Sequence, residues 1–120
     1  DTRVVLLEAR EKKVAFLERA IRELAISNVT AISARLEEYG RSWRSVPFDA
    51  VSIRAVGGLP KVLHSASRAG NPGAHWVYFV GRRDRTEVLL KTLDAARFSP
   101  QVRSGLFGGI LMIGHLPVPA

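Results

Sequence analysis

Charged side chains follow several short apolar runs of the sequence, and these residues are the best placed to do chemistry. Glu8, Arg35 and Arg54 each come directly after such a run. A carboxylate accepts hydrogen bonds from ribose hydroxyls, and a guanidinium binds carboxylates or phosphates. The simpler alternatives are a solvated carboxylate at a helix start for Glu8 and exposed or salt-bridged side chains for the two arginines. The pattern therefore predicts a ligand site only if the fold brings the ends of these runs to one edge.

Other catalytic and metal-binding patterns are missing from the sequence. The chain has no cysteine, which excludes disulfides, thiolate zinc sites and thiol nucleophiles and fits a reducing cytoplasm. Neither a G-x-S-x-G nor a G-x-x-x-x-G-K-[ST] pattern occurs, so hydrolase and phosphate-loop readings have no support. The three histidines, His64, His75 and His115, are far apart and fall in different predicted elements. We therefore expect no metal site.

The charge balance favours a polyanionic partner. The net charge is +7, and the basic excess is concentrated in residues 61–120, which include Arg82 and Arg83. A basic surface rich in arginine suits the phosphates of a nucleic acid. The 120 residues, 47% of them hydrophobic and 24% charged, are enough for one globular domain over residues 1–120. Because the longest apolar stretches are shorter than the roughly 20 residues that cross a bilayer, we expect no membrane span.

Strand and helix patterns alternate along the chain. Apolar residues at helical spacing predict helices over residues 11–26 and 86–96, and Pro60 can open a further helix over residues 61–68. The strands are expected over residues 3–7, 29–34, 48–53, 75–80, 101–107 and 109–116. This order predicts an α/β fold, a partial doubly wound and mostly parallel sheet with a C-terminal antiparallel strand pair. In such a sheet ligands bind beyond the carboxyl ends of the strands, where the candidate residues lie.

Two connecting segments have predictable local structure. Residues 36–39 are expected to form at most one helical turn, followed by a polar loop. Residues 70–73, Gly-Asn-Pro-Gly, predict a turn before the fourth strand.

Four short motifs follow one another within residues 4–60. They read KKVAFL at residues 12–17, NV at 28–29, RLEE at 35–38 and FDAVSIRA at 48–55. In this order they resemble the motifs of the glucose-inhibited division protein B family. Members of that family are S-adenosylmethionine-dependent methyltransferases that modify a guanine N7 in 16S ribosomal RNA, and their fold is the Rossmann-like class I methyltransferase fold.

The resemblance implies roles for matching residues. Leu36 and Glu37 correspond to the pair that borders the adenine of S-adenosyl-L-methionine, Glu8 to the acid that binds its ribose, and Arg54 to an arginine of the cofactor site. Substrate contacts are expected from Arg35, Arg82 and Arg83, with ribosomal RNA or the small ribosomal subunit as partner and the cytoplasm as location. No catalytic base is implied, because guanine N7 offers a lone pair and loses no proton.

The sequence also departs from the family pattern. Ile53 stands where the family usually has serine, and Val80-Gly81 replaces a Lys-Gly pair. The glycine-rich motif that holds the methionine part of the cofactor would precede Asp1, so the chain is expected to be a C-terminal portion. By analogy with class I methyltransferases, the strand that carries this motif lies between the strands ending at Leu7 and Ile53. We therefore expect an N-terminal segment or another chain to complete the sheet.

Two other interpretations follow from the same residues. The chain is alternatively an inactive methyltransferase-like fragment that binds RNA or a protein partner through its basic second half. An unrelated doubly wound signalling domain is disfavoured, because no acidic cluster follows the first predicted strand.

Overall fold

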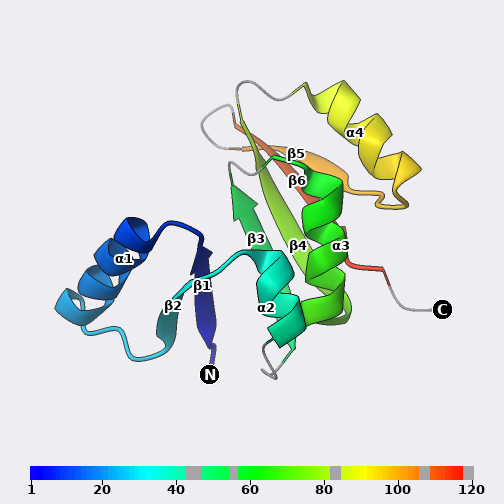
Figure 1. Ribbon diagram of the computed structural model, residues 1–120. Helices are drawn as coiled ribbons and strands as arrows, with labels where there is room; N and C mark the ends of the chain where they lie inside the picture. Colours follow the sequence, from blue (N-terminus) through cyan, green and yellow to red (C-terminus); the bar gives the residue numbers. More distant parts are fainter. Residues whose placement is uncertain (43–46, 55–56, 82–84, 106–108, 118–120) are drawn as a thin grey trace. The chain divides into compact units, whose positions relative to one another are not determined.

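The structure is a computed structural model that describes residues 1–42, 47–54, 57–81, 85–105 and 109–117 (Figure 1). The elements in chain order are β1 (Val4–Glu8), α1 (Glu11–Glu23), β2 (Val29–Ser33), α2 (Leu36–Ser42), β3 (Phe48–Arg54), α3 (Leu59–Ala69), β4 (Gly70–Val80), α4 (Thr86–Ala95), β5 (Gln101–Ser104) and β6 (Ile110–His115). The chain divides into two compact units, Asp1–Trp43 and Arg44–Ala120, and each is described by itself. Within the described ranges, no helix is long and apolar enough to span a membrane.

The first unit contains a parallel strand pair with α1 packed beside it. β1 and β2 pair along their whole lengths, with Val4 opposite Val29 and Glu8 opposite Ser33. The two strands are rich in β-branched and large apolar residues, which fit a pleated surface covered by a helix. α1 turns the buried side chain of Val14 inward, as its 3.6-residue spacing predicts.

α1 ends before the predicted C-terminus because the chain turns into the left-handed region. Ala25 has φ of +52°, and its N–H donates to the carbonyl of Arg22 at 3.1 Å. The N–H of Ile26 donates to the carbonyl of Ile21, also at 3.1 Å. This pair of bonds is a Schellman motif, with an alanine in the position that glycine usually takes.

The prediction of at most one helical turn after β2 is wrong, because α2 runs for seven residues, Leu36–Ser42. One backbone hydrogen bond and one side-chain hydrogen bond stabilise its first turn. The N–H of Tyr39 donates to the carbonyl of Arg35 at 3.0 Å, and the Arg35 N–H donates to Oε2 of Glu38 at 3.5 Å. Glu37 and Glu38 also lie where the helix dipole favours negative charge. These hydrogen bonds and the favourable position of the two carboxylates outweigh the low helix propensity of Gly40.

The second unit is built on a four-stranded sheet in the order β3-β4-β6-β5. β3 and β4 are parallel, whereas β6 is antiparallel to both β4 and β5. The predicted α/β fold with an antiparallel ending is thereby confirmed. The prediction of one domain over residues 1–120 stays a prediction.

The predicted turn at residues 70–73 is wrong, because these residues lie inside β4 as an irregular bulge. The register jumps from Phe48 opposite Gly70 to Ala50 opposite His75, so several residues of β4 face a single residue of β3. Gly73 has φ of +74°, which a residue with a side chain rarely adopts. The turn-forming residue types therefore produce a local bend without ending the strand.

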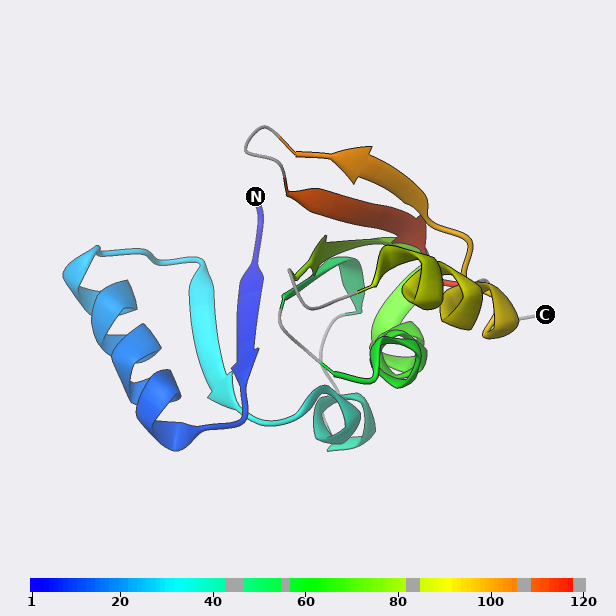
Figure 2. The same ribbon diagram turned by 90° about the horizontal axis from the view of Figure 1, so that it is seen from above.

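The core of the second unit lies between the sheet and its two helices. α3 and α4 cover the same side of the β4–β6–β5 sheet (Figure 2). The side chains buried in this core include Leu59, Val62, Leu63 and Ala66 of α3, Trp76 and Tyr78 of β4, Leu93 of α4, and Met112 of β6. Because side chains alternate along a strand, His75, Val77 and Phe79 lie on the other face of β4.

Candidate functional site

The carboxyl end of the β1–β2 pair brings several sequence-predicted residues together. Glu8 ends β1 opposite Ser33, and the Ala34 N–H donates to the Glu8 carbonyl at 3.1 Å, which extends the ladder one step. Arg35 follows directly. Glu8 and the start of α2 therefore lie at the same end of the strand pair, where parallel sheets bind ligands.

The Glu8 side chain is half-buried and points toward the start of α1. Its Oε1 accepts a hydrogen bond from the backbone N–H of Arg10 at 3.1 Å, next to the first residue of α1. This contact orients the carboxylate at a helix N-terminus, where negative charge is stabilised. The arrangement matches the helix-start interpretation of Glu8 and leaves its ribose-binding role a prediction.

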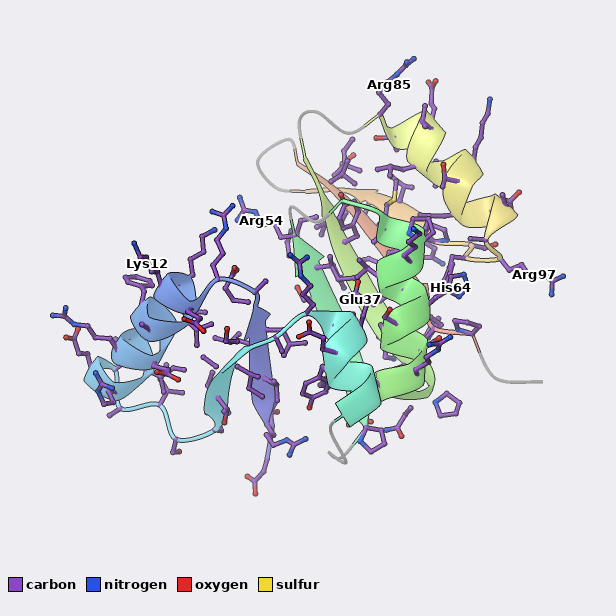
Figure 3. The ribbon with its side chains drawn as sticks, in the orientation of Figure 1. Lys12, Glu37, Arg54, His64, Arg85 and Arg97 are labelled. Carbon is purple, nitrogen blue, oxygen red and sulfur yellow. The ribbon has the colours of Figure 1, made fainter. Side chains whose placement is uncertain are left out.

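The beginning of α2 presents one apolar and one acidic side chain. Leu36 is half-buried, whereas Glu37 and Arg35 are exposed. Glu37 extends from α2 in Figure 3. The capping contact of Glu38 with the Arg35 N–H holds the turn that carries both residues. An apolar side chain beside a carboxylate can cover the face of an aromatic base and accept a hydrogen bond from its edge.

Arg54 belongs to the second unit, where it is the last residue of β3. It lies opposite Phe79 of β4, and its side chain is exposed (Figure 3). Arg82 and Arg83 lie outside the described residues. The substrate roles expected for Arg35, Arg82 and Arg83 stay predictions.

The histidines are not all far apart, contrary to the sequence-based prediction. His75 on β4 and His115 on β6 lie directly opposite each other, with ring centroids 4.4 Å apart. His64 is separate and packs edge-on against Phe98 at 5.0 Å. The sequence places these two histidines in the predicted strands 75–80 and 109–116, but only the register between β4 and β6 shows that they face each other. Among the described residues, no group of three or more His, Cys, Asp or Glu could hold a metal ion.

Solved structures share the fold of this chain. An rRNA methylase from Streptococcus thermophilus aligns with a TM-score of 0.67 and 15% identity, over 96% of this chain and 74% of its own. A SAM-dependent methyltransferase from Aquifex aeolicus aligns with a TM-score of 0.73 and 12% identity, over 95% of this chain and 69% of its own. The fold is therefore that of the SAM-dependent methyltransferases.

Sequence comparisons identify the family within that class. The family model for rRNA small subunit methyltransferase G matches residues 1–104. The enzyme of that name from Haemophilus ducreyi is 32% identical over 108 residues, which cover 85% of this chain and 51% of the relative. The one from a Thermotoga species is 37% identical over 79 residues, or 66% of this chain and 34% of the relative. The chain belongs to the rRNA small subunit methyltransferase G family, and it spans about half the length of the Haemophilus relative.

Proposed function

We propose that this chain is the C-terminal portion of a methyltransferase that transfers a methyl group from S-adenosyl-L-methionine to a guanine N7 of small-subunit ribosomal RNA. The observation that carries the proposal is the family match over residues 1–104. In the proposed enzyme, residues 1–120 belong to a single cytoplasmic methyltransferase domain that is incomplete without a further segment.

The residues at the carboxyl end of β1 and β2 fit part of this cofactor. The Glu8 carboxylate would accept hydrogen bonds from the ribose hydroxyls, and Leu36 and Glu37 would border the adenine. Arg54 would contribute a positive charge to the cofactor site. When bound, the cofactor supplies a methyl group on a positively charged sulfur.

The chain's own residues need to position the base and exclude water, but not to remove a proton. Guanine N7 already carries a lone pair, so no general base is required. Arg35, Arg82 and Arg83 are proposed to hold the phosphates of the RNA. The basic excess of residues 61–120 supports an RNA partner for the second unit.

Two strand edges support the proposal that a further segment completes the sheet. Among the described residues, β1 pairs with β2 alone and β3 pairs with β4 alone. Central parallel strands expose backbone N–H and C=O groups at such edges and attract another strand. The proposed occupant is one strand from outside these 120 residues, supplied by an N-terminal segment or by a second chain.

Methyl transfer from labelled S-adenosylmethionine to isolated small ribosomal subunits tests the activity. We expect label in N7-methylguanosine when the 120 residues are extended upstream by a family glycine-rich segment. Label at another atom of the RNA would refute the N7 assignment. Cofactor binding without methyl transfer would favour the alternative of an inactive RNA-binding or protein-binding fragment.

A further inference from the structure

We propose that His75 and His115 form a binding site for a divalent transition-metal ion of the Ni²⁺, Cu²⁺ and Zn²⁺ type. Both side chains are exposed, and they lie on neighbouring antiparallel strands, β4 and β6, which run side by side (Figure 1). The rings are 4.4 Å apart between centroids and inclined by 52°. Neutral imidazole is a good ligand for these ions.

A backbone carbonyl sets which ring nitrogen of His115 is available. Nδ1 of His115 lies 3.0 Å from the carbonyl oxygen of Gly73. A carbonyl oxygen only accepts hydrogen bonds, so Nδ1 carries the hydrogen and donates it. Nε2 is left with a lone pair for a ligand. A histidine that donates one ring N–H to a carbonyl while binding metal through the other nitrogen is the usual arrangement in metalloproteins.

The β4 bulge places that carbonyl. Gly73 has φ of +74° within the irregular stretch that precedes His75. The Leu116 N–H donates to the Ala74 carbonyl at 2.8 Å, which ties the end of β6 to the same stretch. The orientation of the His115 ring is therefore fixed by ordered backbone on both strands.

The ring separation agrees with binding of one ion by both imidazoles. A metal–nitrogen bond of about 2.1 Å, with the ring centroid about 1.1 Å beyond the nitrogen, places the centroids of two rings about 4.5 Å apart at the 90° angle of a tetragonal Ni²⁺ or Cu²⁺ site and about 5.2 Å apart at the angle of a tetrahedral Zn²⁺ site. The 4.4 Å separation is close to the first of these values, and the 52° inclination differs from a parallel stack. With His115 held by Gly73, a small rotation of the exposed His75 side chain then brings its ring nitrogen to the ion.

Water would fill the remaining coordination positions, since no third His, Asp or Glu among the described residues completes the group. We therefore expect an exchangeable ion that binds more weakly than in a closed four-ligand site. Because the paired geometry exists only in the folded chain, bound ion stabilises the fold by mass action. The ion would clamp β4 to β6.

Calorimetric titration of the untagged chain with NiCl₂ tests the proposal, with His75→Ala, His115→Ala and the matched control His64→Ala. His64 is also exposed, but its ring packs on Phe98. We expect one ion per chain, affinity reduced at least about tenfold in either strand variant, and unchanged affinity in the control. Equal affinity in all four proteins, or no binding by the unchanged chain up to millimolar NiCl₂, would overturn the proposal.

Thermal unfolding gives a second readout, with His75→Gln and His115→Gln as variants that keep a polar side chain. Ni²⁺ should raise the midpoint of the unchanged chain and of His64→Ala, and a chelator should reverse the increase. An equal increase in the glutamine variants would show that the ion binds elsewhere and would refute the assignment. Neither readout involves the methyltransferase cofactor, so the proposed function is tested separately.

Discussion

Among the glycines of the described residues, Gly114 in β6 has the least room for a side chain. A Cβ atom there would lie 2.6 Å from Nε1 and 2.7 Å from Cε2 of Trp76, which is itself 1% exposed. The Trp76 indole, to which both atoms belong, cannot move easily, because it lies in the core between β4 and the helices.

We predict that Gly114→Ala lowers the free energy of unfolding by about 1–3 kcal/mol, the usual cost of overpacking a core. Urea unfolding followed by tryptophan fluorescence measures it. Gly109→Ala is the control, because a Cβ there meets no atom within 4 Å. Equal stability of Gly114→Ala and the control would contradict the packing described for Trp76.

Glu8 is the residue whose cofactor role can be separated most cleanly from its structural role. Glutamine at this position keeps an oxygen that can accept the Arg10 N–H bond but loses the negative charge. In the complete protein, we predict that Glu8→Gln weakens S-adenosylmethionine binding about tenfold or more, since hydrogen bonds to charged groups contribute about 1.5–3 kcal/mol.

Calorimetry measures this affinity, with Glu11→Gln as a charge-matched control in the first turn of α1. The control should bind as the unchanged protein does. If Glu8→Gln binds equally well, the carboxylate serves the helix start alone.

At the scale of elements, the helix C-termini carry strain that a glycine would relieve. Ala25 ends α1 in the left-handed region, and Arg97 does the same after α4 with φ of +65°. A residue with a Cβ pays roughly 1–2 kcal/mol in this conformation.

We predict that Ala25→Gly stabilises the chain by up to about 1 kcal/mol, whereas the same change at the exposed, mid-helical Ala15 destabilises it by about 1 kcal/mol. Chemical unfolding of both variants measures the difference. Destabilisation by Ala25→Gly as large as that of Ala15→Gly would contradict the Schellman ending of α1.

Sequence patterns predicted the elements better than their ends and pairings. Apolar runs and helical spacing located the strands of the described residues and the helices α1 and α4, because burial of one face dominates these segments. Pro60 indicated the start of α3. The end of α1 was missed, since it depends on a left-handed alanine rather than on hydrophobicity. The start of α2 agrees with the prediction, but its length was underestimated. The sequence predicts a turn at residues 70–73 because Gly73 is compatible with either a turn or a bulge. Only the pairing of β4 with β3 distinguishes the two.

For the candidate site, the sequence allows a prediction of where residues lie in the fold, whereas their roles stay predictions. Residues at strand ends were readable, because the carboxyl edge of a parallel sheet follows from strand order. The His75–His115 pair was not, because it depends on the register between β4 and β6.

At the scale of the whole molecule, the basic excess predicts salt-sensitive RNA binding. Each phosphate contact contributes roughly 0.7–0.9 to the slope of log affinity against log salt. In the complete protein, the double substitution Arg82→Ala and Arg83→Ala should reduce that slope by up to about 2 and weaken binding without changing the preferred RNA sequence.

Filter binding of ribosomal RNA over a range of salt concentrations measures the slope. Lys12→Ala with Lys13→Ala removes the same charge from the exposed surface of α1 and serves as the control. A larger effect of the α1 substitutions would locate the RNA contact in the first unit and contradict the assignment to residues 61–120.

The most direct test of the central claim is calorimetric titration of S-adenosylhomocysteine, the demethylated cofactor, into two matched proteins. One is the 120-residue chain, and the other is the same chain extended upstream by a family segment that includes the glycine-rich motif. If a missing strand completes the sheet, the extended protein binds with micromolar affinity and the 120-residue chain does not. Micromolar binding by the 120 residues alone would contradict the account.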